Sequence, residues 1–148
     1  MLKIYTDGAS RGNPGPGGFG VVMIYGEHRK EISEGYKYTT NNRMELLSVI
    51  VALESLKKDG TTATVYSDSK YVVDAVELKW LFGWEKKHFK DKKNPDLWMR
   101  FLKVYRRHAV KFVWVKGHSS NIENNRCDEL AVAAALGKGL KVDVGYGG

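Results

Sequence analysis

The sequence has one cysteine and no long apolar run, and these absences exclude several classes of protein. A lone Cys127 excludes an intramolecular disulfide and a zinc site built from several cysteines. No apolar run approaches the ~20 residues that a membrane-spanning helix needs. The N-terminal residues lack the basic segment and apolar stretch of a secretory signal. We therefore expect a protein of the reducing cytoplasm that is not inserted in a membrane.

The composition indicates a single globular domain. Of the 148 residues, 43% are hydrophobic and 28% are charged, which is typical of a folded chain long enough to bury a core. No internal repeat and no long linker divides the sequence. We predict one domain over residues 1–137, followed by a loose glycine-rich tail over residues 138–148. The net charge of +7 favours a polyanionic partner.

The order of β-rich and periodic segments predicts an α/β protein. Strands are expected at Leu2–Asp7, Phe19–Tyr25, Glu31–Tyr38, Thr62–Ser67 and Val110–Val115. Helices are expected at Asn42–Lys57, Ser69–Leu78, within Trp80–Lys93, from Pro95 to about His108, and at Ile122–Leu136. Three successive strands followed by alternating strands and helices favour a mixed sheet with helices on both faces.

Two aspartates end predicted strands. Asp7 precedes Gly8, and Asp68 precedes Ser69. If the two strands are parallel neighbours, both carboxylates lie at the edge of the sheet where ligands of open α/β folds bind. The alternative is that each aspartate caps a helix or stabilises a turn.

Two further acids lie on the apolar rows of predicted helices. Glu45 shares a helical row with Val49, and Asp128 shares one with Ala131. A buried carboxylate needs a cation, so structural salt bridges to the nearby Arg43 and Arg126 are the alternative reading. If all four acids converge, their oxygens favour Mg²⁺ or Mn²⁺. Such a cluster can hold two metals about 4 Å apart for phosphoryl transfer.

Several sequence blocks carry a resemblance to a known family. The blocks are Tyr5–Ala9, Gly12–Gly18, Thr40–Leu46, Ser67–Val72, Trp114–His118 and Asn125–Ala131. In this order, from residue 1 to about Leu136, they resemble the type 1 ribonuclease H family. The resemblance implies a five-stranded mixed sheet and hydrolysis of the RNA strand of RNA–DNA hybrids, leaving 5′-phosphate and 3′-hydroxyl ends.

The same resemblance implies roles for particular residues. It implies that four acids are catalytic and bind two Mg²⁺ ions, with Mn²⁺ as a possible substitute. These acids are Asp7, Glu45, Asp68 and Asp128. His118 matches a loop histidine that assists proton transfer or product departure, although by itself it reads as an exposed loop residue. We expect a monomer.

The expected substrate contacts come from three segments. Asn13 lies in a glycine-rich segment that also reads as a plain hairpin turn, and Asn41 begins the helix that carries Glu45. These polar groups can read the 2′-OH that distinguishes RNA from DNA. Thr40 and Asn94, together with Asn13, are the candidates for a phosphate pocket. Tyr38 weakens that assignment, because the family often has an arginine there.

A segment rich in aromatics and lysine, Trp80–Lys93, resembles the basic handle by which family members grip the DNA strand. Its expected contacts are Trp80, Trp84, Lys86 and Lys87. The alternative is a core tryptophan pair below a solvated lysine loop. Phe89 stands where a third tryptophan is common, and Lys70 where a glutamine is common.

Two other functions remain open on the sequence. One is a module that binds hybrids without cleaving them, with the acids serving structure. The other is a related nuclease that acts on branched or double-stranded DNA.

Overall fold

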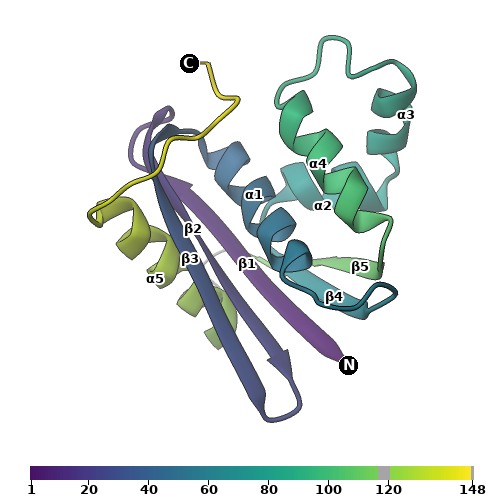
Figure 1. Cartoon of the computed structure of the whole chain (residues 1–148), viewed down its shortest axis with the longest axis horizontal. Helices are drawn as coiled ribbons and strands as arrows, with labels where there is room; N and C mark the ends of the chain where they lie inside the picture. Colours follow the sequence, from purple (N-terminus) through teal and green to yellow (C-terminus); the bar gives the residue numbers. More distant parts are fainter. Residues whose placement is uncertain (117–120, 148) are drawn as a thin grey trace.

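The computed structural model describes residues 1–116 and 121–147, which form one five-stranded mixed sheet. Its strands are β1 (Leu2–Ser10), β2 (Gly15–Tyr25), β3 (His28–Thr39), β4 (Thr62–Ser67) and β5 (Ala109–Trp114). They lie in the order β3-β2-β1-β4-β5 (Figure 1). β1 pairs antiparallel with β2 and parallel with β4, and β4 pairs parallel with β5. The predicted mixed sheet is confirmed.

The described residues contain five helices, which cover both faces of the sheet. They are α1 (Asn41–Glu54), α2 (Lys70–Glu77), α3 (Trp80–Lys86), α4 (Pro95–Tyr105) and α5 (Ile122–Leu136). α5 packs on β1, β2 and β3, and the other helices lie on the opposite side (Figure 1). Successive side chains of β1 point to opposite faces of the sheet, because side chains alternate along a strand. Ile4 enters the main core with α1, and Tyr5 joins a smaller cluster with Cys127 of α5.

Glycines let α5 approach the sheet closely. A Cβ atom on Gly20 would lie 2.3 Å from the backbone oxygen of Cys127, and one on Gly35 would lie 2.1 Å from that of Ala134. Both distances are too short for any side chain. β2 begins at Gly15, four residues before the predicted Phe19, because glycines that read as a turn also provide this flat packing surface.

Side-chain caps fix where two helices begin. The Thr40 hydroxyl accepts a hydrogen bond from the Arg43 amide and starts α1, and the Ser69 hydroxyl accepts one from the Val72 amide and starts α2. Ser69, and not Asp68, is therefore the N-cap of α2. The reading of Asp68 as a capping residue is wrong, and its carboxylate is left for another role.

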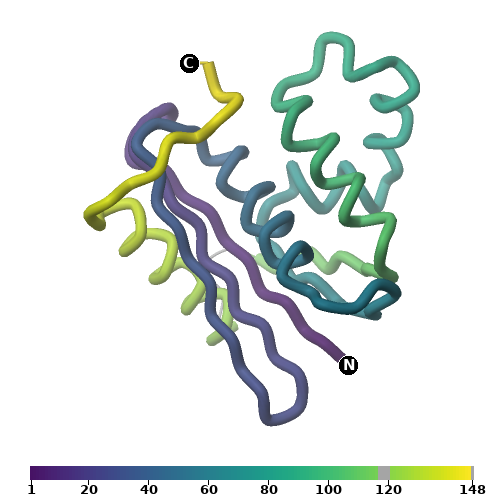
Figure 2. The backbone as a smooth tube through the Cα atoms, in the orientation of Figure 1, coloured from purple at the N-terminus to yellow at the C-terminus, as the bar shows by residue number. Residues whose placement is uncertain are grey.

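The C-terminal tail is anchored, whereas the sequence predicted a loose segment. The Lys37 amide donates to the Lys141 carbonyl at 2.8 Å, so the tail runs beside β3 (Figure 2). Asp143 is 7% exposed and accepts hydrogen bonds from the Thr39 hydroxyl at 2.6 Å and from Arg43 Nε at 2.7 Å. A buried carboxylate paired with a buried guanidinium holds the tail, and glycine content alone does not reveal such a pair.

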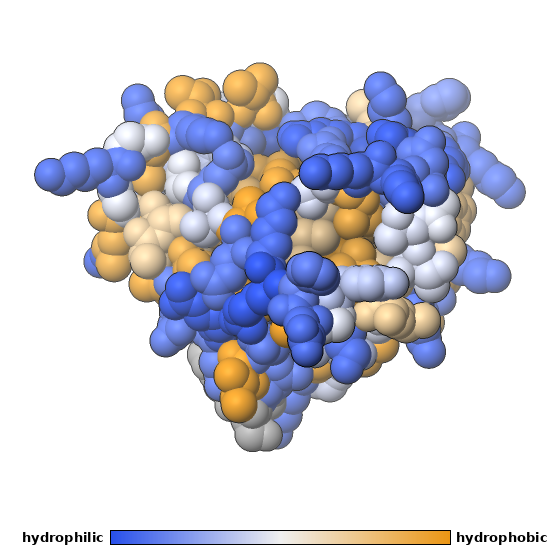
Figure 3. Space-filling view, turned by 60° about the horizontal axis from the view of Figure 1, so that its bottom comes forward, coloured by the Kyte–Doolittle hydropathy of each residue, from blue (hydrophilic) through white to orange (hydrophobic). Residues whose placement is uncertain are grey.

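One face of the molecule is predominantly polar. The face in Figure 3 is covered mainly by hydrophilic side chains, with hydrophobic residues showing between them in several places. None of the helices in the described residues combines the length and the apolar character that a membrane crossing requires.

Candidate active site

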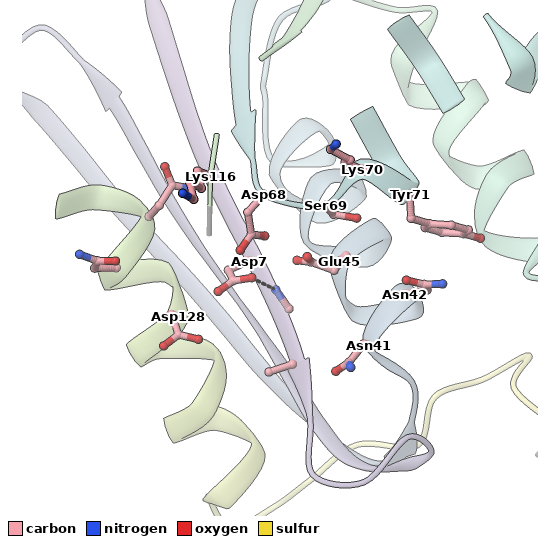
Figure 4. Close-up of a pocket in the computed structure, with 14 residues that line it drawn as sticks. Asp7, Asn41, Asn42, Glu45, Asp68, Ser69, Lys70, Tyr71, Lys116 and Asp128 are labelled. Atoms are coloured by element: carbon pink, nitrogen blue, oxygen red, sulfur yellow. Dashed lines mark hydrogen bonds between the residues drawn. The ribbon is translucent and has the colours of Figure 1, made fainter. Parts of the chain in front are cut away.

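The four acids line one cavity of about 400 Å³. Asp7 lies in β1, Asp68 directly follows β4, Glu45 lies in α1, and Asp128 lies in α5 (Figure 4). Because β1 and β4 are parallel neighbours, Asp7 and Asp68 share one region of the sheet, as expected. The helices bring Glu45 and Asp128 to this region from opposite faces of the sheet.

Three of the acids form a tight group. Carboxylate oxygens of Asp7, Glu45 and Asp68 all lie within 4.8 Å of one another. Asp128 faces the same cavity, with Asp7 between it and Glu45 in the view of Figure 4. Within the described ranges, one buried oxygen of Glu45 and one of Asp68 have no hydrogen-bond partner. Oxygen donors of this kind suit a hard divalent cation such as Mg²⁺.

Burial and mutual repulsion disfavour the charged form of this group. Burial, followed by the nearby charge of Asp68, raises the pKa of Asp7 to about 7. Burial and then the charge of Asp7 raise the pKa of Glu45 well above its ordinary value. Bringing these carboxylates together therefore costs stability, and a bound cation would offset that cost.

The arginines that could have neutralised the acids are engaged elsewhere. Arg43 pairs with Asp96 at 2.8 Å and with Asp143 at 2.7 Å. Arg126 pairs with Glu31 at 2.9 Å and with Glu129 at 3.4 Å. In residues 1–116 and 121–147, no lysine, arginine or histidine forms an ion pair with any of the four acids. The alternative of structural salt bridges from Arg43 to Glu45 and from Arg126 to Asp128 is therefore wrong.

The cavity also contains polar residues that the sequence analysis did not select. Lys116 and Asn124 line it together with Lys70. Helical spacing could have indicated Asn124, because it lies four residues before Asp128 and so on the same face of α5. His118, predicted to assist proton transfer, lies outside the described residues.

The predicted phosphate contacts meet in a second cavity of about 550 Å³. Asn13, Thr40 and Asn94 all line it. The side-chain oxygen Oδ1 of Asn13 accepts a hydrogen bond from the backbone N–H of Asn41 at 3.1 Å. This bond leaves the side-chain NH₂ group of Asn13 available as a donor. Asn94 is committed at both ends, to Arg43 at 3.2 Å and to the Tyr71 hydroxyl at 3.1 Å.

Tyr38, which stands where the family often has an arginine, contacts the C-terminal tail beside this second cavity. Tyr38 packs against Tyr146 of the tail, with ring centres 5.7 Å apart. Tyr146 in turn lines the cavity and lies 5.6 Å from the Arg43 guanidinium. An aromatic pair anchored by the tail thus occupies this edge.

Asn41 lines the first, acidic cavity, and its side-chain oxygen accepts a hydrogen bond from the backbone N–H of Ser10 at 2.7 Å.

The two handle tryptophans differ in environment. Trp80 is 52% exposed, whereas Trp84 packs edge-on against the buried Trp98, with ring centres 5.8 Å apart. Both line a third cavity together with Lys87. Phe89 is buried at 7% exposure, so its ring belongs to the core and is not an exposed contact surface. The core alternative thus describes the position of Trp84 but not that of Trp80. Lys86 is exposed in the last turn of α3.

The mixed sheet and its acidic cavity place this protein among nucleases of the ribonuclease H fold, and comparison with known proteins agrees. The family model for RNase H matches residues 1–136. A ribonuclease H of Syntrophus aciditrophicus is 54% identical, covering 99% of this chain and 87% of the relative. One of Trichodesmium erythraeum is 52% identical, covering 98% and 95%. The chain belongs to the ribonuclease H family, and it is an enzyme of that family.

Solved structures agree with this assignment. LC9-RNase H1, described as a type 1 RNase H with the type 2 active-site motif, superposes with a TM-score of 0.84 at 33% identity, covering 98% of this chain and 78% of that one. LC11-RNase H1, solved in complex with an RNA/DNA hybrid, gives a TM-score of 0.71 at 29% identity, covering 92% and 97%. The predicted resemblance to type 1 ribonuclease H and its fold are confirmed.

Proposed function

We propose that the protein is a metal-dependent endonuclease that hydrolyses the RNA strand of RNA–DNA hybrids. The observation that carries this proposal is the group formed by Asp7, Glu45 and Asp68, whose carboxylate oxygens lie within 4.8 Å of one another without a basic partner in the described residues. Its relative LC11-RNase H1 is described in complex with a hybrid, which supports the same substrate here.

The four acids would hold the divalent ions, Mg²⁺ or Mn²⁺ as a substitute. Asp7, Glu45 and Asp68 supply the central oxygens, and Asp128 supplies another from α5. Two bound ions would activate a water and stabilise the departing 3′ oxygen, which leaves 5′-phosphate and 3′-hydroxyl ends. The carboxylates act as a rigid scaffold of negative charge. We assign proton transfer or product release to His118.

The substrate would cross the cavities described above. Asn41 and Glu45, which line the same cavity, would read the 2′-OH of the RNA strand, the group that distinguishes RNA from DNA. The free amide hydrogens of Asn13 and the Thr40 hydroxyl would contact a DNA phosphate in the second cavity, next to Asn94.

The handle would hold the DNA strand further along. The exposed ring of Trp80 offers a surface for a deoxyribose, and Trp84, which packs against the buried Trp98, lines the same third cavity. Lys86 and Lys87 supply positive charge for phosphates. One chain contributes all four acids, so a monomer suffices for this activity.

Digestion of labelled nucleic acids tests the proposal. A 5′-labelled RNA–DNA hybrid is incubated with Mg²⁺ or with EDTA, beside double-stranded RNA and double-stranded DNA. We expect cleavage of the hybrid alone, only with Mg²⁺, and abolished by Asp7→Asn. Asp74→Asn, in α2 and outside the acidic cavity, is the matched control and should cleave normally.

Three results would reject the proposed function. Near-native turnover by Asp7→Asn would remove the acids from the chemistry. Hybrid binding without any product would leave a binding module with structural acids. Preferred cleavage of double-stranded DNA would point to a different nuclease on the same fold.

A further inference from the structure

Lys70 stands at the edge of the acidic cavity and takes no part in the reaction outlined above. It is the first residue of α2, two positions after Asp68, and it is one of the residues that line the cavity. Its ammonium lies 4.8 Å from the ring centre of Trp114, the last residue of β5. Lys70 therefore lies at the edge of the acidic cavity with its ammonium over the Trp114 ring.

Trp114 is fixed in turn by the backbone next to the acids. Its indole N–H donates to the Asp68 carbonyl at 3.1 Å. Trp114 nevertheless remains 43% exposed, which is a large solvent-facing area for a tryptophan at the end of a strand. The indole thus forms a fixed, exposed platform whose position is tied to that of Asp68.

The Lys70 ammonium has no carboxylate partner in the described residues, although three carboxylates gather nearby. Figure 4 shows its ammonium above Asp68 and Glu45 in that view, apart from both carboxylates. A cation over an exposed aromatic face is held weakly, so an anion such as a phosphate can replace the ring as its partner at little cost. The structure therefore keeps a lysine charge available at the edge of the site instead of neutralising it within the acidic group.

We propose that Lys70 binds a backbone phosphate of the nucleic acid at the edge of the acidic cavity, with Trp114 as its positioning residue. The inference rests on the proposed function, because it places the hybrid across this cavity. An ammonium recognises phosphate as a point charge and carries no base specificity. Lys70 thus adds a phosphate contact beside the metal site, separate from the handle and from the second cavity.

The salt dependence of hybrid binding tests this assignment. Affinity is measured in EDTA by fluorescence anisotropy at several KCl concentrations for wild type, Lys70→Gln and Lys70→Arg. Lys30→Gln is the matched control, since Lys30 is exposed near the far end of the β2–β3 hairpin. One duplex phosphate contact contributes about 0.9 to the slope of log affinity against log salt.

We expect Lys70→Gln to weaken binding and to lower that slope by about 0.9. The advantage of wild type over Lys70→Gln should then shrink by about 3.5-fold between 50 and 200 mM salt, a ratio that follows from that slope. Lys70→Arg keeps the charge and should keep the wild-type slope. Lys30→Gln should match wild type in both affinity and slope.

A double-mutant cycle separates the positioning role of Trp114 from a purely structural one. Trp114→Leu should weaken hybrid binding when Lys70 is present and have little effect in the Lys70→Gln protein. Trp114→Phe keeps a ring below the ammonium and should restore most of the lost affinity. Equal losses from Trp114→Leu in both backgrounds would overturn the positioning role.

A salt slope that Lys70→Gln leaves unchanged would overturn the assignment of Lys70. If affinity nevertheless falls, the loss is then of the same size at every salt concentration and indicates an uncharged contact such as a base edge. Cleavage of the hybrid by wild type is measured separately in Mg²⁺ with the same protein preparation, because absence of cleavage would instead refute the proposed function.

Discussion

Replacing Asp7 by asparagine should stabilise the metal-free protein while it abolishes cleavage. The folded protein raises the pKa of Asp7 from 3.8 to about 7, chiefly through burial and then through the charge of Asp68. Each pKa unit corresponds to about 1.4 kcal/mol, so the charged carboxylate costs up to about 4 kcal/mol of folding free energy above pH 7. Asparagine keeps the shape and removes that charge.

The sign of the pH dependence follows from the raised pKa. The folded state holds a proton on Asp7 more tightly than the unfolded state, so wild type gains stability as the pH falls from about 7 towards 4. The advantage of Asp7→Asn should therefore be greatest at pH 8 and absent below pH 4. For a chain of this size, about 4 kcal/mol corresponds to a rise in Tm of roughly 8–16 °C.

Urea unfolding followed by circular dichroism, in EDTA at pH 8 and at pH 5, measures this effect. Mg²⁺ should then raise the stability of wild type far more than that of Asp7→Asn, because binding to the folded state alone is stabilising. Equal or lower stability of Asp7→Asn at pH 8 would refute the reasoning, and so would an advantage that does not change with pH. Asp74→Asn should behave as wild type throughout.

Three other changes test the packing and the handle. Asp143→Asn should cost about 3–5 kcal/mol of unfolding free energy, because it leaves Arg43 buried with less compensation, and urea titration measures it; a loss below about 1 kcal/mol would contradict the anchored tail. Gly20→Ala should lower Tm, because its Cβ would lie 2.3 Å from an α5 backbone oxygen, and an unchanged Tm would disprove that close approach. Replacing the handle lysines Lys86, Lys87 and Lys90 with alanine should lower the salt slope of hybrid binding by up to about 2.7. The single-turnover cleavage rate at saturating enzyme should change little. A collapse of that rate would show that the handle does more than bind the substrate.

Local pattern predicted most of the elements. Thr62–Ser67 and Ile122–Leu136 match the predicted bounds, and the other elements differ mainly at their ends. Helical spacing also indicated that Glu45 and Asp128 lie on inward-facing rows. These properties depend on residues a few positions apart, so they can be read directly from the order of amino acids.

Pairing between distant residues could not be read in this way. The partners of Arg43 are Asp96 and Asp143, 53 and 100 positions away, and not the nearby Glu45. Tail anchoring, the burial of Phe89 and the contact between Lys70 and Trp114 likewise depend on segments that meet only after folding. Sequence distance contains no information on these contacts.

The sequence by itself determined the family, the order of strands and helices, and which acids face inward, because motifs and periodicity are local. Only the tertiary structure decided that Asp7, Glu45 and Asp68 form one group without a basic partner in the described residues. The physical reason is that the charge balance of a site depends on every group within a few ångströms. Chain folding, and not chain order, selects those groups.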